Sequence, residues 1–162
     1  MNLRAVWVLA AALLMSLVVA PPSAAESKLK VSEGHAARVI LIKDGDTLVV
    51  RLQPTDKKLK LRVLGADCPE GPKRADPSDL GQAATEAAKA LLLGKDIKLE
   101  SENGDGKYKH DRFGRLLAFV RLADGVDYGL KMIADGHCGD FSWKYPHPRS
   151  AEYAAAEKKT QK

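Results

Sequence analysis

The stretch VILIKDGDTLVVRL (residues 39–52) joins two apolar, β-branched runs through the sequence DGDT at residues 44–47. Asp-Gly between alternating apolar runs is a strong hairpin signal, because glycine adopts positive φ freely and aspartate hydrogen-bonds its own backbone. The stretch therefore predicts two antiparallel strands joined by a tight turn. A turn needs only one of the two aspartates, so the second carboxylate beside strands that will be buried requires a further explanation.

The N-terminal segment, residues 1–25, is predicted to be a cleavable secretory signal peptide. It has Arg4, then an apolar run over residues 5–20, then small residues with Ser23 and Ala25 at the spacing of an A-x-A-like cleavage site. A membrane anchor is the alternative, because the run is near the lower length limit for a span. We expect a secreted or periplasmic monomer without stable membrane association after cleavage.

The pattern of the remaining chain predicts a polar lead-in at residues 26–34 and one domain over residues 35–160. Strand-like patterns occupy residues 35–43, 47–53, 58–66, 95–102 and 115–125, and helical patterns occupy residues 79–94, 126–136 and 150–162. The predicted order is three strands, one helix, two strands and further helices. This is the element order of an OB-fold barrel. The expected fold class is therefore α+β, a five-stranded OB-fold β-barrel with about three helices.

Charge and cysteine content give weaker indications. The chain has 162 residues and a net charge of +5, which is compatible with an anionic partner but does not identify one. An exported protein meets an oxidising compartment, where Cys68 and Cys138 can form a disulfide. Two separate buried thiols are the alternative. A cysteine nucleophile is disfavoured, because no histidine lies near Cys68 in the sequence.

Carboxylates cluster at the expected strand ends. Asp44 and Asp46 lie at the hairpin, and Asp67 and Glu70 follow the third strand. In a barrel the first turn and the exit of the third strand lie close together, so Asp46 and Asp67 can converge as hard oxygen ligands. Such ligands suit Ca²⁺ or Mg²⁺ rather than zinc, which prefers closely spaced cysteine and histidine.

Two arginines complete a plausible phosphodiesterase site. Arg62 on the third strand and Arg115 at the start of the fifth can hold phosphate oxygens and stabilise a five-coordinate transition state. Glu70 can orient or deprotonate the attacking water. Each residue also has an ordinary structural explanation, as a turn cap, an ion-pair partner or a solvated loop residue, but one metal-and-phosphate site accounts for all of them together.

Three stretches resemble the signature motifs of the thermonuclease family, the staphylococcal nuclease-like proteins. They are DGDT at residues 44–47, RVLGADCPE at residues 62–70 and DRFGRLLAF at residues 111–119. The resemblance covers residues 35–145 and implies an OB-fold enzyme that cleaves DNA and RNA with Ca²⁺. In this family water attacks phosphorus and the 5′-oxygen leaves, so 3′-phosphate ends are expected.

The resemblance also implies a role for each matching residue. Asp46, Asp67 and the backbone carbonyl of Thr47 are expected to bind Ca²⁺, with Asp44 in support. The catalytic residues are expected to be Arg62, Arg115 and Glu70, the first two as phosphate-binding arginines and the last as the general base.

The aromatic residues depart from the family pattern. Phe113 stands where the family often has tyrosine, so a hydroxyl is absent, although the ring can still stack on a base. Trp143 and Tyr145 lie in the region where the family carries its base-stacking tyrosines. They are expected to bind substrate, and ordinary core packing is the alternative.

The resulting hypothesis is a secreted Ca²⁺-dependent nuclease that cuts DNA and RNA with low sequence specificity. The alternative is a non-catalytic OB-fold module that binds single-stranded nucleic acid or protein. A small structural domain stapled by the two cysteines is a third possibility. The presence of the complete carboxylate and arginine set favours the enzyme.

Overall fold

The computed structural model describes residues 34–71 and 80–161. The predicted signal peptide and nearly all of the predicted lead-in lie outside the described residues. None of the helices in the described part of the chain is long and apolar enough to cross a membrane.

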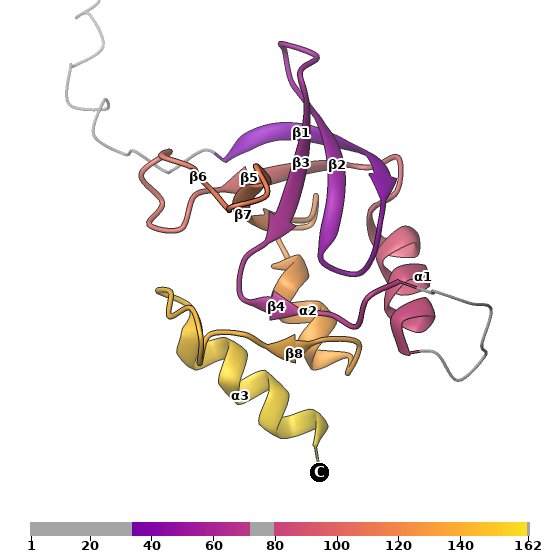
Figure 1. Cartoon of the computed structure of the whole chain (residues 1–162), viewed down its shortest axis with the longest axis vertical. Coiled ribbons are helices and arrows are strands. Elements are labelled where there is room, and N and C mark those ends of the chain that lie inside the picture. The colour runs from indigo at the N-terminus through magenta and orange to yellow at the C-terminus, as the bar shows by residue number, and fades with distance from the viewer. Residues whose placement is uncertain (1–33, 72–79, 162) are drawn as a thin grey trace, which may run out of the picture. The chain divides into compact units, whose positions relative to one another are not determined.

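Five strands form a closed barrel, which confirms the predicted OB-fold (Figure 1). They are β1 (His35–Ile42), β2 (Thr47–Leu52), β3 (Lys58–Val63), β5 (Asp96–Glu100) and β7 (Leu116–Arg121). Neighbours in the order β3-β2-β1-β5-β7 are antiparallel, and a parallel pairing of β3 with β7 closes the barrel. The closure places the ends of β2, β3 and β7 side by side.

Three further strands have only two residues each and were not expected from the sequence. β4 (Ala66–Asp67) pairs with β8 (Gly139–Asp140), and β6 (Lys109–His110) pairs with β7. The segments that hold β6 and β8 were predicted to be irregular, because two residues are too few to show a period-two pattern. The β4–β8 pair joins the exit of β3 to the segment after the second helix.

The three predicted helices are α1 (Leu80–Leu92), α2 (Tyr128–Ala134) and α3 (Ser150–Thr160). Helix α1 contacts β1, and α2 contacts both β7 and α3. The buried face of α1 includes Thr85, while Ala83 is exposed. The Thr85 hydroxyl donates to the Gly81 carbonyl at 2.7 Å, so the buried polar group is satisfied within the helix.

An ion-pair network links the barrel to the C-terminal helix. Glu100, at the end of β5, accepts two hydrogen bonds of 2.8 Å from Arg121 and also pairs with Arg149. Arg149 donates to Asp127 at 2.5 Å, and the Tyr153 hydroxyl of α3 donates to the same carboxylate at 2.8 Å. Hydrogen bonds from Arg121, and then from Arg149, lower the pKa of Glu100 to about 2, against the opposing effect of desolvation.

We expect Glu100→Gln to lower the free energy of unfolding by about 2 kcal/mol near neutral pH, because two partly buried arginines lose a charged partner. The pKa of Glu100 is lowered from 4.5, so its stabilisation is present above that value and is lost as the pH falls toward about 2. The difference between variant and wild type should therefore shrink in acid. Urea unfolding at neutral pH and at about pH 3 measures this.

The matched control is Asp96→Asn, which removes a carboxylate from an exposed pair with Arg38. Surface pairs contribute little, so this variant should unfold close to wild type. A Glu100→Gln deficit that stays constant across the pH range would contradict the electrostatic explanation.

Candidate active site

The hairpin between β1 and β2 is held in place by its surroundings rather than by turn chemistry alone. Gly45 is not among the described glycines with positive φ, so the conformational reason predicted for it is wrong. A Cβ at Gly45 would instead lie 2.8 Å from both the Cβ and the Sγ of Cys68. The Tyr128 hydroxyl of α2 donates to the Gly45 carbonyl at 2.6 Å. Close packing from two sides therefore fixes the position of the two aspartates.

Asp46 is the buried centre of the site, with 1% of its surface exposed. Its Oδ1 accepts from the Thr47 hydroxyl at 3.1 Å and from Arg62 Nη1, and its Oδ2 accepts from the Cys68 backbone N–H at 2.7 Å. Burial, with a smaller effect of Asp44, raises the pKa of Asp46 to about 7, although Arg62 and the Cys68 N–H favour the charged form. Burial thus disfavours the charged form of this carboxylate.

Arg62 lies between two of the predicted carboxylates. One nitrogen, Nη1, pairs with Asp46, and the other, Nη2, lies 2.9 Å from Asp67 Oδ1 and 3.3 Å from the Ala66 carbonyl. Thr47 on β2 is directly opposite Arg62 on β3, which explains why the guanidinium reaches the hairpin. The structure therefore brings Asp46, Arg62 and Asp67 together.

Arg115 reaches the same site from β7. Its Nη1 donates to the Thr47 hydroxyl at 3.3 Å, and its Nε pairs with Asp111 at 2.6 Å. Asp111 also accepts from the backbone N–H groups of Phe113 and Arg115. Asp111 was not predicted as the residue that holds Arg115, although a carboxylate four residues before the arginine in DRFGR is a signal for such a pair.

The oxygen donors fit a hard divalent cation in their chemistry. Asp44 and Asp46 are buried carboxylates, Asp67 is an exposed one, and the raised pKa of Asp46 indicates that more positive charge would be accommodated. Within residues 34–71 and 80–161, however, no group of three or more His, Cys, Asp or Glu side chains is arranged to hold a metal. The Thr47 carbonyl already accepts from the Lys43 N–H at 2.9 Å, and Arg62 bridges Asp46 to Asp67.

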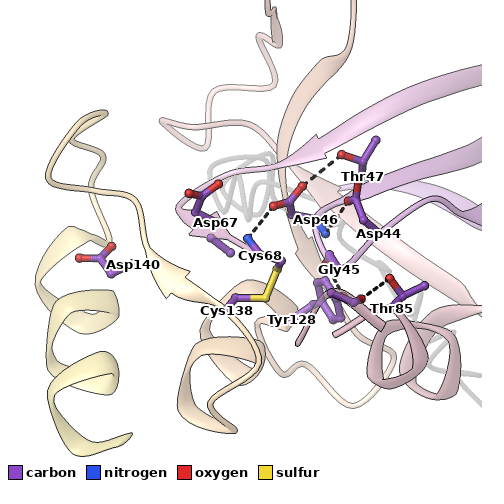
Figure 2. Close-up of a disulfide and its surroundings, with 12 residues drawn as sticks. Asp44, Gly45, Asp46, Thr47, Asp67, Cys68, Thr85, Tyr128, Cys138 and Asp140 are labelled. Carbon is purple, nitrogen blue, oxygen red and sulfur yellow. Dashed lines mark hydrogen bonds between the residues drawn. A yellow bond between two sulfur atoms is a disulfide. The ribbon is translucent and has the colours of Figure 1, made fainter. Parts of the chain in front are cut away.

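The two cysteines form a disulfide immediately beside these carboxylates (Figure 2). Their Cα atoms are 4.2 Å apart and they are separated by 70 residues in the sequence. Cys68 follows Asp67 directly, and Cys138 precedes β8. The bond therefore ties the loop that carries Asp67 and Glu70 to the segment after α2.

Glu70 lies in the same loop, three residues after Asp67. It is exposed and lines an open hollow together with Asp44, Lys43 and Lys89. It is thus next to Asp44 of the hairpin and accessible to solvent. This position suits the predicted role of a residue that exchanges protons with water.

The predicted substrate-binding aromatics lie at the surface. Phe113, Trp143 and Tyr145 have exposed fractions of 66%, 76% and 61%. Core packing, the alternative explanation for Trp143 and Tyr145, is therefore wrong. The Arg115 guanidinium lies 5.3 Å from the centre of the Phe113 ring, and the Arg62 guanidinium lies 6.0 Å from the ring of Phe141, which contacts Tyr145. An exposed ring thus lies beside Arg115, and a half-buried ring lies beside Arg62.

The family whose description is "Staphylococcal nuclease homologue" matches residues 60–162. The chain belongs to the staphylococcal nuclease family. The matched region contains Arg62, Asp67, Glu70 and Arg115, and the hairpin carboxylates lie just before it. Membership agrees with the closed barrel and with the motifs read from the sequence.

Several curated relatives support this membership of the staphylococcal nuclease family. A protein of Bacillus anthracis described as uncharacterized is 33% identical over 121 residues, which cover 74% of this chain and 54% of that protein. The "Thermonuclease" of Staphylococcus hyicus is 33% identical over 100 residues, covering 61% and 55% of the two chains. An "Uncharacterized endonuclease" of Escherichia coli is 29% identical over 99 residues, covering 61% and 56%. The chain thus spans about half the length of the curated relatives it matches.

Proposed function

We propose that this protein is a Ca²⁺-dependent nuclease that hydrolyses phosphodiester bonds in DNA and RNA with low sequence specificity. The observation that carries the proposal is a continuous chain of polar contacts from Arg62 through Asp46 and the Thr47 hydroxyl to Arg115. These contacts link two guanidinium groups to a buried carboxylate, Arg62 directly and Arg115 through the Thr47 hydroxyl. The names of the Staphylococcus and Escherichia relatives point in the same direction.

The two arginines bind the scissile phosphate. Each presents a planar fork of donors that matches phosphate oxygens, and each remains charged at any physiological pH. Asp111 anchors Arg115, so this arginine needs little rearrangement to stabilise the additional negative charge of a five-coordinate transition state. The exposed part of each side chain, 18% for Arg62 and 22% for Arg115, leaves an approach for substrate.

Glu70 acts as the general base in this proposal. Its carboxylate is exposed beside Asp44, where it can orient a water molecule and accept its proton as the oxygen attacks phosphorus. The 5′-oxygen then leaves, which gives 3′-phosphate ends. This direction of cleavage follows from the family resemblance.

Asp46 and Asp67 would hold Ca²⁺, with the Thr47 carbonyl as a further oxygen and Asp44 in support. When bound, the ion supplies positive charge that compensates these carboxylates and polarises the phosphate. Support comes from the all-oxygen donor set and from the raised pKa of Asp46. Arg62 would then release the carboxylates and donate its hydrogen bonds to the phosphate.

The substrate is proposed to be single-stranded or locally opened nucleic acid. Phe113 next to Arg115, and Trp143 and Tyr145 in contact with Phe141, offer exposed rings on which unpaired bases can stack. Stacking and phosphate contacts are insensitive to base identity, so they account for low sequence specificity.

We also propose that the protein works outside the cytoplasm, secreted or in a periplasm, as a monomer. The N-terminal sequence pattern supports export, and a disulfide is the form expected of two cysteines in an oxidising compartment.

The proposal predicts cleavage of single-stranded DNA in Ca²⁺ and none in EGTA. Glu70→Gln should reduce the cleavage rate by about 100-fold or more, because a general base contributes at least that factor. The measurement is the initial rate of release of acid-soluble oligonucleotides by the purified protein, with phosphatase sensitivity of the ends as a test for 3′-phosphates.

Glu86→Gln is the matched control, since Glu86 is an exposed glutamate on α1 paired with Lys89. It should cleave like wild type. DNA binding without cleavage in any divalent metal would refute the nuclease and favour the non-catalytic binding module.

A further inference from the structure

A line of cationic side chains leads away from Arg62 along the outer face of the barrel. Strand β3 alternates between exposed and buried positions, so Lys58, Lys60 and Arg62 lie on one face. Arg51 on β2 is directly opposite Lys58 and therefore on the same face. We call Arg51, Lys58 and Lys60 the basic stripe.

The basic stripe is poorly neutralised. Within the described residues, no carboxylate lies within ion-pair distance of Lys58 or Lys60, and both are exposed. Arg51 reaches Asp56 only at 3.9 Å, and its buried Nε has no hydrogen-bond partner. Like charges directly opposite each other in an antiparallel pair destabilise a sheet, so the Arg51–Lys58 pair is a cost in the free protein.

Arg38 on β1 is opposite Arg51 and therefore lies on the same face, but it is neutralised by Asp96 through two hydrogen bonds of 2.8 Å. Lys58 and Lys60, on the same strand as Arg62, have no such ion-pair partner among the described residues. Residues on one strand face repeat at about 6.6 Å, so Lys58 lies about 13 Å from Arg62, a span suited to successive phosphates of an extended strand.

We propose that the basic stripe binds the phosphates of single-stranded nucleic acid next to the bond that is cut, and so extends the substrate site along β3. The inference rests on the proposed function for the position of the cut bond, but binding to the stripe does not require catalysis. A single strand is favoured over a duplex, because Phe113 beside Arg115, and Trp143 and Tyr145 around the Phe141 ring that lies near Arg62, are exposed for stacking with unpaired bases.

The test compares the salt dependence of binding to a fluorescent single-stranded oligonucleotide in EGTA. Each phosphate contact contributes about 0.7 to the slope of log affinity against log salt concentration for single strands. Lys58→Gln/Lys60→Gln should therefore reduce the slope by about 1.4 relative to wild type. The same double variant should raise KM for a long single strand and leave kcat/KM for a dinucleotide unchanged.

Lys158→Gln/Lys159→Gln is the control, because it removes the same net charge from exposed residues of α3. It should keep the wild-type slope. Lys58→Arg/Lys60→Arg, which retains both positive charges, should also have the wild-type slope. Equal slopes for wild type and both glutamine variants, or no binding of the oligonucleotide by wild type at low salt, would overturn the inference. If wild type cleaves DNA but the slopes are equal, the proposed binding by the basic stripe is wrong and the proposed nuclease function stands. If the slopes differ but wild type does not cleave, binding by the stripe stands and the proposed nuclease function is wrong.

Discussion

Arg62→Gln is expected to lower DNA cleavage by about 1000-fold while Ca²⁺ affinity rises about tenfold. The loss of cleavage follows because one charged donor aimed at the transition-state phosphate contributes up to this factor. The gain in affinity follows from the contacts in the structure: the guanidinium pairs with Asp46 and Asp67, the same carboxylates that are proposed to bind Ca²⁺. Removing a positive charge that contacts these carboxylates strengthens their attraction for a cation, although solvent screening reduces the size of the effect.

Calorimetric titration with Ca²⁺ measures the second effect independently of activity. Arg38→Gln is the matched control, because Arg38 also pairs with an aspartate but lies on an exposed part of β1. It should change neither property. If Arg62→Gln instead weakened Ca²⁺ binding along with cleavage, the arginine would be maintaining the structure of the carboxylate site rather than occupying it.

Loss of the Cys68–Cys138 disulfide is expected to have the second large effect. Closing a loop of 70 residues stabilises the folded chain by about 4 kcal/mol in the chain-entropy description. Most globular proteins have enough stability to remain folded after such a loss at room temperature. The activity should fall further than the folded fraction, because Cys68 donates its backbone N–H to Asp46 and lies between Asp67 and Glu70.

Two measurements distinguish these effects: urea unfolding gives the folded fraction, and the cleavage rate is taken under the same conditions. Both are made on wild type with and without dithiothreitol and on Cys68→Ser/Cys138→Ser. The serine variant should not respond to dithiothreitol, which controls for effects of the reductant. Equal losses of activity and folded fraction would show that the disulfide stabilises the domain without positioning the site.

The strands and helices were predictable because they depend on local patterns. Alternation in β3, the apolar runs of β1 and β2, and the glycine that ends each of α1 and α2 lie within a few residues of each other in the sequence. The chemistry of Asp46, Asp67 and the two arginines was also readable, since carboxylates and guanidinium groups have few alternatives as ligands for cations and phosphate.

The contacts between distant residues were decided by the tertiary structure. Parallel pairing of β3 with β7 brings Arg62 and Arg115 to the same site, where Arg62 contacts Asp46 and Arg115 contacts Thr47. The sequence left open whether Cys68 and Cys138 form a disulfide or remain two separate buried thiols, because a spacing of 70 residues does not say whether the thiols meet. The exposure of Trp143 and Tyr145 was likewise open, since an aromatic residue suits a core and a stacking surface equally.

Gly45 illustrates the difference between what the sequence determines and what the tertiary structure decides. The sequence by itself determined that the chain turns at DGDT and that two strands leave the turn. The tertiary structure decided why the glycine is needed: the side chain of Cys68 occupies the space where a Cβ would lie, and Tyr128 holds the carbonyl from the other side. Local sequence specifies elements through backbone preferences that act over a few residues, whereas the site depends on packing between segments that only the closed barrel brings into contact.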